Sequence, residues 1–307
     1  MGFNMRAFNA LNGLIYSFGW VFCILCGASH LTLPPLIFTL IAVIAQLYFL
    51  YKQDQKVYYT DLLVLLYGVS FGYFMEIALI SSGIVTYATE NRFFALFPPG
   101  WIWSLYFLFS LTFNHSLKFL QAYRVLPFLF GALGGPISYL VGQRLGAVTL
   151  SSDAALLFLG ALWGVYLFVM YEFTSRINHS TEKLLSSENL NLPFTIFYDS
   201  ICPICNKEIG HLKNRKLTGK IKFCDLVKNK KIKEVDYFEA MKEIHALGPQ
   251  GQVLKGIDAF SQLYARANLP FLAVLLQAPL VYPLAKFFYS YWAKYRLYNR
   301  CKIQDIR

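Results

Sequence analysis

Six apolar runs of membrane-spanning length fill the first half of the chain and constrain its fold more than any other feature. A helix needs about 20 mostly apolar residues to cross the roughly 30 Å hydrocarbon core of a bilayer. Aromatic residues cluster near the ends of the runs, and the Pro34-Pro35 and Pro98-Pro99 breaks lie between them. We therefore predict an all-α polytopic membrane bundle over residues 1–174. The runs are approximately 10–28, 33–51, 60–84, 101–121, 125–147 and 153–173.

The rest of the chain has a different composition. Residues 1–174 hold 7 Lys+Arg and 6 Asp+Glu, a net +1, whereas residues 175–307 hold 21 and 11, a net +10, and the two add to the +11 of the whole chain. Residues 175–191 are polar, which predicts a linker. A basic surface beside a bilayer attracts anionic lipids, and no nucleic-acid-binding motif is apparent. We therefore expect membrane lipids, and not nucleic acid, as partners.

Residues 192–307 alternate strand-like and helix-like segments, which predicts an α/β domain after the linker. Its predicted elements are a strand over 193–199, a helix over 203–215, a strand over 220–225, a helix over 234–241, a strand pair over 243–255 and a helix over 257–267.

The distribution of Lys and Arg predicts the orientation in the membrane. With a cytoplasmic N-terminus, seven basic residues at the ends of the runs lie inside, and only Arg92 and Arg144 lie outside. After six spans the C-terminal domain would also be cytoplasmic, in a reducing compartment. The seven inner residues are Arg6, Lys52, Lys56, Lys118, Arg124, Arg176 and Lys183.

Two cysteines separated by two residues, Cys202 and Cys205, stand between a predicted strand and a predicted helix. A helix N-terminus favours the thiolate of the first cysteine, and the second can resolve a mixed disulfide. The strand, C-x-x-C, helix pattern is typical of thioredoxin-like redox sites. We predict that Cys202 attacks, that Cys205 resolves, and that Asp199 accepts a proton or holds the loop. A helix should start at Cys202, with its sulfur exposed.

Two other interpretations of this pair stay open. A zinc site would need a second pair of ligands, and the nearby Cys224, His211 and His245 form no close pair in the sequence. The two cysteines could also be merely structural. The strand-to-helix context favours redox chemistry, so we expect neither a metal nor a cofactor.

The residues around Cys202 and Cys205 resemble those of the DCC family of thiol-disulfide oxidoreductases, over roughly residues 192–302. The resemblance implies a thioredoxin-like fold and dithiol chemistry, with no defined substrate. The chain has no proline just before the His245 strand, where thioredoxins place a cis-proline beside the disulfide. The matching stretches are 198–205 (D-x-x-C-x-x-C), 223–225 (a second strand), 241–247 (M-x-x-x-H-A-L) and 251–260 (a glycine turn and helix start).

Residues 60–173 are similar to an uncharacterised family of bacterial inner-membrane proteins. The resemblance implies a multi-pass protein of the bacterial inner membrane and brings no activity. It rests on the stretches 97–101, 112–117, 131–142 and 144–148.

Ionisable residues at membrane depth are costly and are therefore candidate sites. Glu76 lies well inside the third run, and Asn114 and His115 lie within the fourth. A hydrogen-bond network and a proton-relay or substrate site are both open interpretations of these three residues.

Cys23 and Cys26 form a second C-x-x-C in the first run, with both thiols on one helix face. They are either small buried apolar residues or a second redox pair.

An aromatic segment over 269–292 is interrupted by Pro270, Pro279 and Pro283. It is either a seventh span or a set of helices lying in the membrane interface, and the prolines favour the interface.

The sequence leaves two hypotheses for the function of the protein. The first is a membrane-tethered thiol-disulfide oxidoreductase acting on an unidentified thiol or disulfide protein or small molecule. The second is a small-molecule transporter or membrane scaffold whose C-terminal domain senses redox state.

Overall fold

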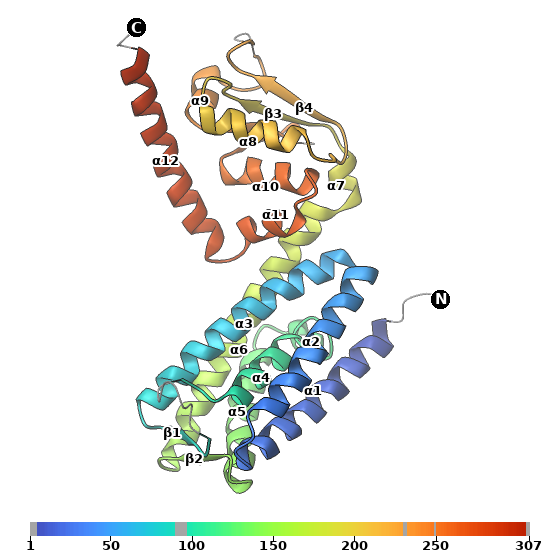
Figure 1. Ribbon diagram of the computed structural model, residues 1–307, viewed down its shortest axis with the longest axis vertical. Helices are drawn as coiled ribbons and strands as arrows, with labels where there is room; N and C mark the ends of the chain where they lie inside the picture. The colour runs from blue at the N-terminus through green and yellow to red at the C-terminus, as the bar shows by residue number, and fades with distance from the viewer. Residues whose placement is uncertain (1–4, 90–96, 230–231, 249, 305–307) are drawn as a thin grey trace. The chain divides into compact units, whose positions relative to one another are not determined.

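The computed structural model describes residues 5–89, 97–229, 232–248 and 250–304, with side chains up to residue 296 (Figure 1). Arg92, used in the orientation argument, lies outside the described residues. The chain divides into two compact units, Met1–Ser175 and Arg176–Arg307. We call them the membrane unit and the C-terminal unit.

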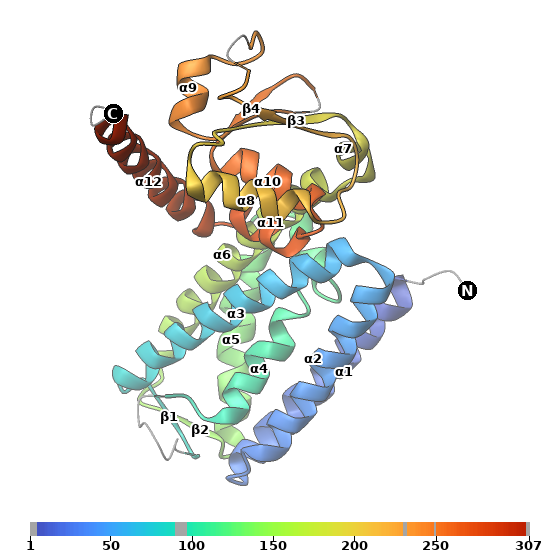
Figure 2. The same cartoon turned by 45° about the horizontal axis from the view of Figure 1, so that its top comes forward.

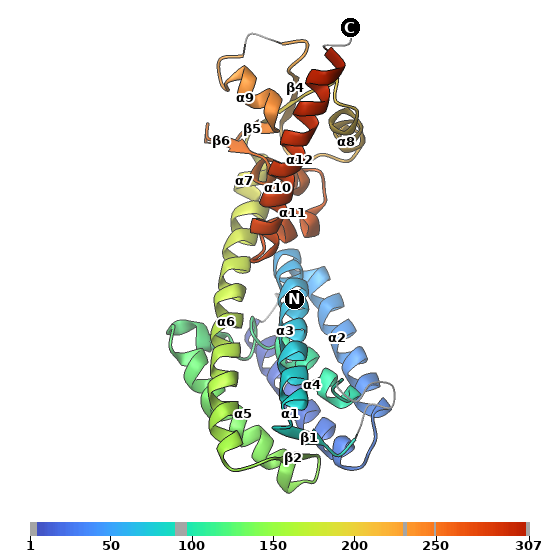
Figure 3. The same ribbon diagram turned by 90° about the vertical axis from the view of Figure 1, so that its left-hand side faces the viewer.

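The membrane unit is mostly helical. A two-stranded antiparallel ribbon joins β1 (Val85–Tyr87) to β2 (Val148–Leu150), so the chain before α4 and the chain after α5 meet at one end of the unit (Figure 3). Its helices are α1 (Met5–Ala28), α2 (Leu33–Gln53), α3 (Gln55–Ser81), α4 (Gly100–Ser110), the short 3-10 helix η1 (Lys118–Ala122), α5 (Leu126–Arg144) and the first part of α6 (Ala154–Leu185).

Several helices of the described chain are long and apolar enough to cross a membrane. Four qualify singly, namely α1, α2, α3 and the segment Ala154–Asn191, and a bent pair near the C-terminus would make five. The predicted count of about six is not confirmed. A mostly helical, membrane-associated N-terminal region is what the structure supports.

The fourth predicted run, 101–121, is not one continuous helix. Helix α4 ends at Ser110 after 11 residues, about 16 Å, and turns lead from there into η1. Side chains bind the carbonyls that the break exposes: Leu111 O accepts from Asn12 Nδ2 at 3.1 Å and from Gln46 Nε2 at 3.3 Å. Such substitutes are needed because a bilayer offers no water to a broken helix.

Helices α5 and α6 approach each other closely through glycine (Figure 3). A Cβ atom at Gly131 would lie 2.3 Å from the carbonyl oxygen of Trp163, and one at Gly135 would lie 2.5 Å from its Cγ. Small residues at an i, i+4 spacing commonly permit such contacts between membrane helices. The indole of Trp163 is therefore held firmly against α5.

The predicted linker, 175–191, is helical. Helix α6 runs on to Leu185, and α7 (Ser187–Asn191) follows after one residue. The Ser186 side chain caps α7 by accepting from the Asn189 N–H at 3.2 Å. The segment holds neither Gly nor Pro, and it is helical except at the break at Ser186.

The C-terminal unit contains a four-stranded sheet in the order β4-β3-β5-β6. Strands β3 and β4 are parallel, β5 is antiparallel to β3, and β6 is antiparallel to β5. The strands are β3 (Phe194–Tyr198), β4 (Ile221–Asp225), β5 (His245–Leu247) and β6 (Val253–Lys255), and the helices are α8 (Pro203–Lys213), α9 (Tyr237–Lys242), α10 (Ile257–Arg266), α11 (Pro270–Gln277) and α12 (Val281–Gln304).

Helices cover both faces of this sheet (Figure 2). Alternate residues of β3 point to opposite faces, so Phe194 and Ile196 pack with α8 and α10, whereas Phe197 packs with α9. The central strand is therefore buried on both sides, and it ends at the loop that carries the cysteine pair.

Candidate redox site and polar clusters of the membrane unit

The loop after β3 is fixed by Asp199. Its side chain is buried, and Oδ1 accepts a hydrogen bond from the Ile201 N–H at 3.0 Å. This local turn brings Cys202 to the N-cap position of α8, with Pro203 as the first helical residue. Of the two roles predicted for Asp199, the geometry supports holding the loop.

The two sulfurs lie at the start of α8. Cys202 Sγ accepts from the Cys205 backbone N–H at 3.4 Å. Cys202 is only 6% exposed, so the expectation of an exposed sulfur is wrong; Cys205 is half-buried. Their neighbours Ile201 and Ile204 are 56% and 60% exposed. Two exposed apolar side chains therefore lie next to the pair.

An arginine from the last helix reaches the same site. Arg296 Nη1 of α12 donates to Cys205 Sγ at 3.0 Å, and Nη2 donates to the carbonyls of Met241 and Lys242 at 2.7 and 2.9 Å. The two carbonyls hold the guanidinium in place. Sequence reasoning missed Arg296, because it lies 91 residues from Cys205 and belongs to no local motif.

The two thiols have different acidities. Burial opposes ionisation of Cys202, but hydrogen bonds at the helix N-terminus and the positive charge of Arg296 outweigh it, and the pKa of Cys202 is lowered. Burial, followed by the neighbouring Cys202, raises the pKa of Cys205 to about 12 despite Arg296. Arg296 contacts Cys205, yet Cys202 loses its proton first, since the Cys205 N–H donates to it. The arrangement therefore favours a thiolate on Cys202 beside a protonated Cys205.

The other nearby ligand candidates have structural surroundings. Cys224 lies in β4 opposite Phe197 and packs against the core under α9, where burial raises its pKa. His245 is buried in β5, with Nδ1 3.0 Å from the Glu243 carbonyl oxygen. The described residues contain no group of three or more His, Cys, Asp or Glu placed to hold a metal ion.

Helix α12 presents two different faces. On one, the Tyr289 hydroxyl accepts from the Ile244 N–H at 2.9 Å, just before β5, and its ring packs edge-on against Phe260. On the other, apolar side chains at helical spacing are 57–69% exposed. The exposed set is Leu284, Phe287, Phe288, Tyr291 and Tyr295. Helices α11 and α12 meet at 91°, a bend that fits a broken span or a re-entrant loop.

In the membrane unit, Glu76 is buried and collects three tyrosine hydroxyls. Tyr106 and Tyr139 donate to Oε1 at 2.8 and 2.7 Å, and Tyr87 donates to Oε2 at 2.5 Å. The three tyrosines come from the β1 strand, α4 and α5, so this cluster joins segments far apart in the chain. Sequence reasoning found Glu76 but none of these partners.

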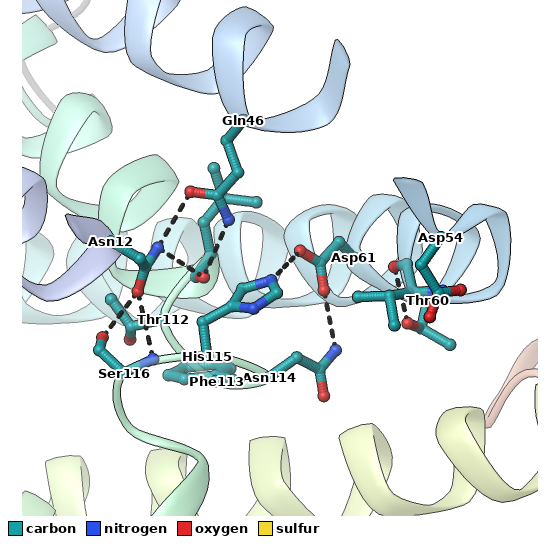
Figure 4. A network of polar contacts seen from close by, with 12 residues as sticks. Asn12, Gln46, Asp54, Thr60, Asp61, Thr112, Phe113, Asn114, His115 and Ser116 are labelled. Atoms are coloured by element: carbon teal, nitrogen blue, oxygen red, sulfur yellow. Dashed lines mark hydrogen bonds and ion pairs between the residues drawn. The ribbon is translucent and has the colours of Figure 1, made fainter. Parts of the chain in front are cut away.

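Asn114 and His115 form a different cluster (Figure 4). His115 Nε2 lies 2.7 Å from Asp61 Oδ2, and Asn114 Nδ2 donates to Asp61 Oδ1 at 2.9 Å. Asn12 of α1 extends this network. Its Oδ1 accepts a hydrogen bond from the Ser116 hydroxyl, and its Nδ2 donates to the Leu111 carbonyl. These contacts hold the break after α4. Among the described residues Glu76 and His115 have different partners, so the structure does not support a direct relay between them.

The second cysteine pair, Cys23 and Cys26, lies inside α1, more than four turns from the helix start at Met5. Both thiols are buried. Every backbone N–H at this depth of a helix is already bound to a carbonyl one turn earlier, so neither sulfur has the unpaired donors of a helix N-terminus.

Comparisons with known proteins bear on both units. Residues 9–169, more than half of the chain, match a family described as protein of unknown function DUF2878. The chain belongs to this family. Residues 196–302 match the DCC1-like thiol-disulfide oxidoreductase family. The fusion of two families predicted from the sequence is therefore confirmed.

One curated relative is an uncharacterised chloroplastic protein of Arabidopsis thaliana, 36% identical over 112 residues. The match covers 35% of this chain and 52% of the relative, so the chain spans about half of that protein's length. No solved structure matches the chain.

Proposed function

We propose that this protein is a membrane-tethered thiol-disulfide oxidoreductase that cycles Cys202 and Cys205 between dithiol and disulfide. The observation that carries the proposal is Cys202 at the N-cap of α8, hydrogen-bonded by the Cys205 N–H and accompanied by Arg296. The family match over 196–302 supports the same chemistry. The sheet order β4-β3-β5-β6, with α8 following the central strand, supports a thioredoxin-like fold.

The reaction proceeds in two exchanges. The Cys202 thiolate attacks one sulfur of a substrate disulfide, that bond breaks, and the departing thiolate takes a proton from water. Cys205 then loses its proton and attacks Cys202 Sγ, which releases the second substrate thiol. The substrate gains two electrons and two protons, and the protein holds the disulfide. The reverse sequence oxidises a dithiol substrate. Exposed Ile201 and Ile204 favour an apolar polypeptide segment as the partner.

We further infer that the protein is a multi-pass component of the bacterial inner membrane with the dithiol on the cytoplasmic side. The four single candidate spans make an even number of crossings. Because β1 and β2 pair, the chain enters α4 and leaves α5 at the same end of the membrane unit. The segment from α4 to α5 therefore returns to the side where it began, whether or not it crosses the membrane. The two ends of the membrane unit then lie on the same side, and the Lys and Arg bias favours the cytoplasm.

Redox titration of the full-length protein in detergent tests this function. Thiols are tagged by mass after equilibration in glutathione buffers, and we expect one two-electron transition that requires both Cys202 and Cys205. Cys202→Ser should abolish exchange with a peptide disulfide, and Cys205→Ser should accumulate mixed disulfides. Unchanged disulfide reduction by both variants would refute the assignment.

A further inference from the structure

A cavity of about 500 Å³ in the membrane unit has no part in the dithiol chemistry. Its size is in the usual range for small-molecule sites. Its walls come from α1, α3, α4, α5 and α6, and most of the lining is apolar or aromatic. The aromatic lining includes Tyr16, Trp20, Trp101, Phe109, Phe130 and Trp163.

Glu76 supplies the acidic group of this wall. It is 1% exposed, and its carboxylate accepts the three tyrosine hydroxyls described above. Three O–H donors suit an ionised carboxylate, which accepts hydrogen bonds at both oxygens; a protonated carboxyl would need one tyrosine oxygen as an acceptor for its own proton. The three hydroxyls are therefore placed to stabilise Glu76 in its ionised form.

An ionised Glu76 would have no cationic partner among the described residues of the wall. None of the described residues that line the cavity is Lys, Arg or His, and the described ion pairs do not include Glu76. Charged residues at membrane depth are normally paired, because an isolated buried charge is costly. A bound cation would supply the missing partner.

The aromatic walls favour an organic cation over a metal ion. Tyr106 stacks on Trp163 with ring centroids 5.9 Å apart, and Tyr87 lies edge-on to Trp101 at 5.4 Å. Tryptophan and tyrosine faces attract alkylammonium groups, and an apolar body gains from burial. Hard metal ions prefer several oxygen ligands and retained water, which a mostly apolar wall does not offer.

We propose that the cavity binds a hydrophobic organic cation, an amine or quaternary ammonium whose charge lies at Glu76 and whose apolar body lies against the aromatic walls. This site is independent of the dithiol function. It gives the membrane unit a ligand class of its own, in agreement with a role in handling small molecules.

Equilibrium dialysis of the full-length protein in detergent against labelled tetraphenylphosphonium tests this site. We expect saturable binding that Glu76→Gln weakens at least tenfold. Triphenylphosphine oxide, a neutral molecule of similar shape, should fail to displace the label at equal concentration. A thermal melting curve of the variant, followed by tryptophan fluorescence and compared with that of the natural chain, reports whether the membrane unit is folded.

A second variant avoids any change to the carboxylate. Gly134 lines the cavity, and a Cβ atom there would meet nothing within 4 Å, so Gly134→Leu should place apolar side-chain atoms in the space that the ligand would occupy. It should weaken binding, whereas Leu133→Phe, at a 67% exposed neighbour on the same helix, should not. No saturable binding to the natural chain, equal displacement by the neutral molecule, or full binding by both Glu76→Gln and Gly134→Leu would each overturn the proposal.

Discussion

The chain carries the same C-x-x-C spacing twice, at two different positions within a helix. Cys23 and Cys26 lie inside a long membrane helix, where the backbone donors are already used. Cys202 and Cys205 begin a helix, with a free N–H directed at one sulfur and a guanidinium at the other. The difference shows that spacing brings two sulfurs together, whereas the position in the helix decides which of them ionises.

The largest expected effect separates the two pairs directly. Cys202→Ser should remove all measurable disulfide exchange, because the attacking thiolate is lost. The double variant Cys23→Ser with Cys26→Ser should exchange at the natural rate, since neither buried thiol takes part. Reduction of a fluorescent peptide disulfide by the full-length protein measures both. Loss of exchange in the second variant would mean that the two pairs act in one electron path.

The next effect concerns the cation. Arg296→Met should raise the pKa of Cys202 and lower its thiolate fraction at neutral pH by about tenfold, as expected for roughly one pKa unit. The rate of iodoacetamide alkylation against pH reports this titration, which in the natural protein lies below the usual value for cysteine. Cys205 should resist alkylation until the pH approaches about 12.

Two controls accompany this experiment. Lys294→Met removes an exposed charge from the same helix and should leave the alkylation profile in place. Stability of the reduced protein provides the second. A thiolate with a lowered pKa stabilises the folded state above the unfolded pKa of cysteine, and this contribution disappears as the pH falls through the folded pKa. Arg296→Met should therefore lose more stability on the alkaline side than at low pH, where the loss comes from the hydrogen bonds to the Met241 and Lys242 carbonyls. An unmoved alkylation profile would remove Arg296 from the mechanism.

The smallest effect tests where the active pair works. The exposed apolar face of α12 predicts contact with the bilayer interface. A fluorophore at Leu284, in a cysteine-free chain reconstituted in nanodiscs, should be quenched about twofold by brominated lipid. The same label at Lys207, an exposed residue of α8, should not be quenched. Equal quenching at the two positions would show that α12 has no special contact with lipid.

The sequence predicted the C-terminal unit closely because its signals are local. The strand predicted over 193–199 is β3 (Phe194–Tyr198), and the helix predicted over 203–215 is α8 (Pro203–Lys213). Proline, the N-cap cysteine and the alternation of buried residues are all readable within a few positions. Arg296 was not predictable, since its role depends on how a helix 91 residues away packs.

The membrane unit was harder to predict for a related reason. Hydropathy records the apolar character of 101–121 but not the hydrogen bonds by which Asn12 and Gln46 stabilise a break at Leu111. Glu76 and His115 were identified only because ionisable residues at membrane depth cost free energy. That argument does not reveal which residues form hydrogen bonds with them. Their separation into a tyrosine cluster and an Asp61 cluster is a property of helix packing.

Helix α12 carries the guanidinium that touches Cys205 and, on its other side, the exposed aromatic face. One helix therefore links the ionisation of the cysteine pair to contact with lipid. If binding to lipid moves this helix, the distance from Arg296 to the cysteine pair changes, and the pKa of Cys202 changes with it. Thermodynamic reciprocity then requires the oxidation state of the pair to change lipid affinity by the same factor. The redox state of the cysteine pair would then be measurable as a change in the affinity of the protein for lipid.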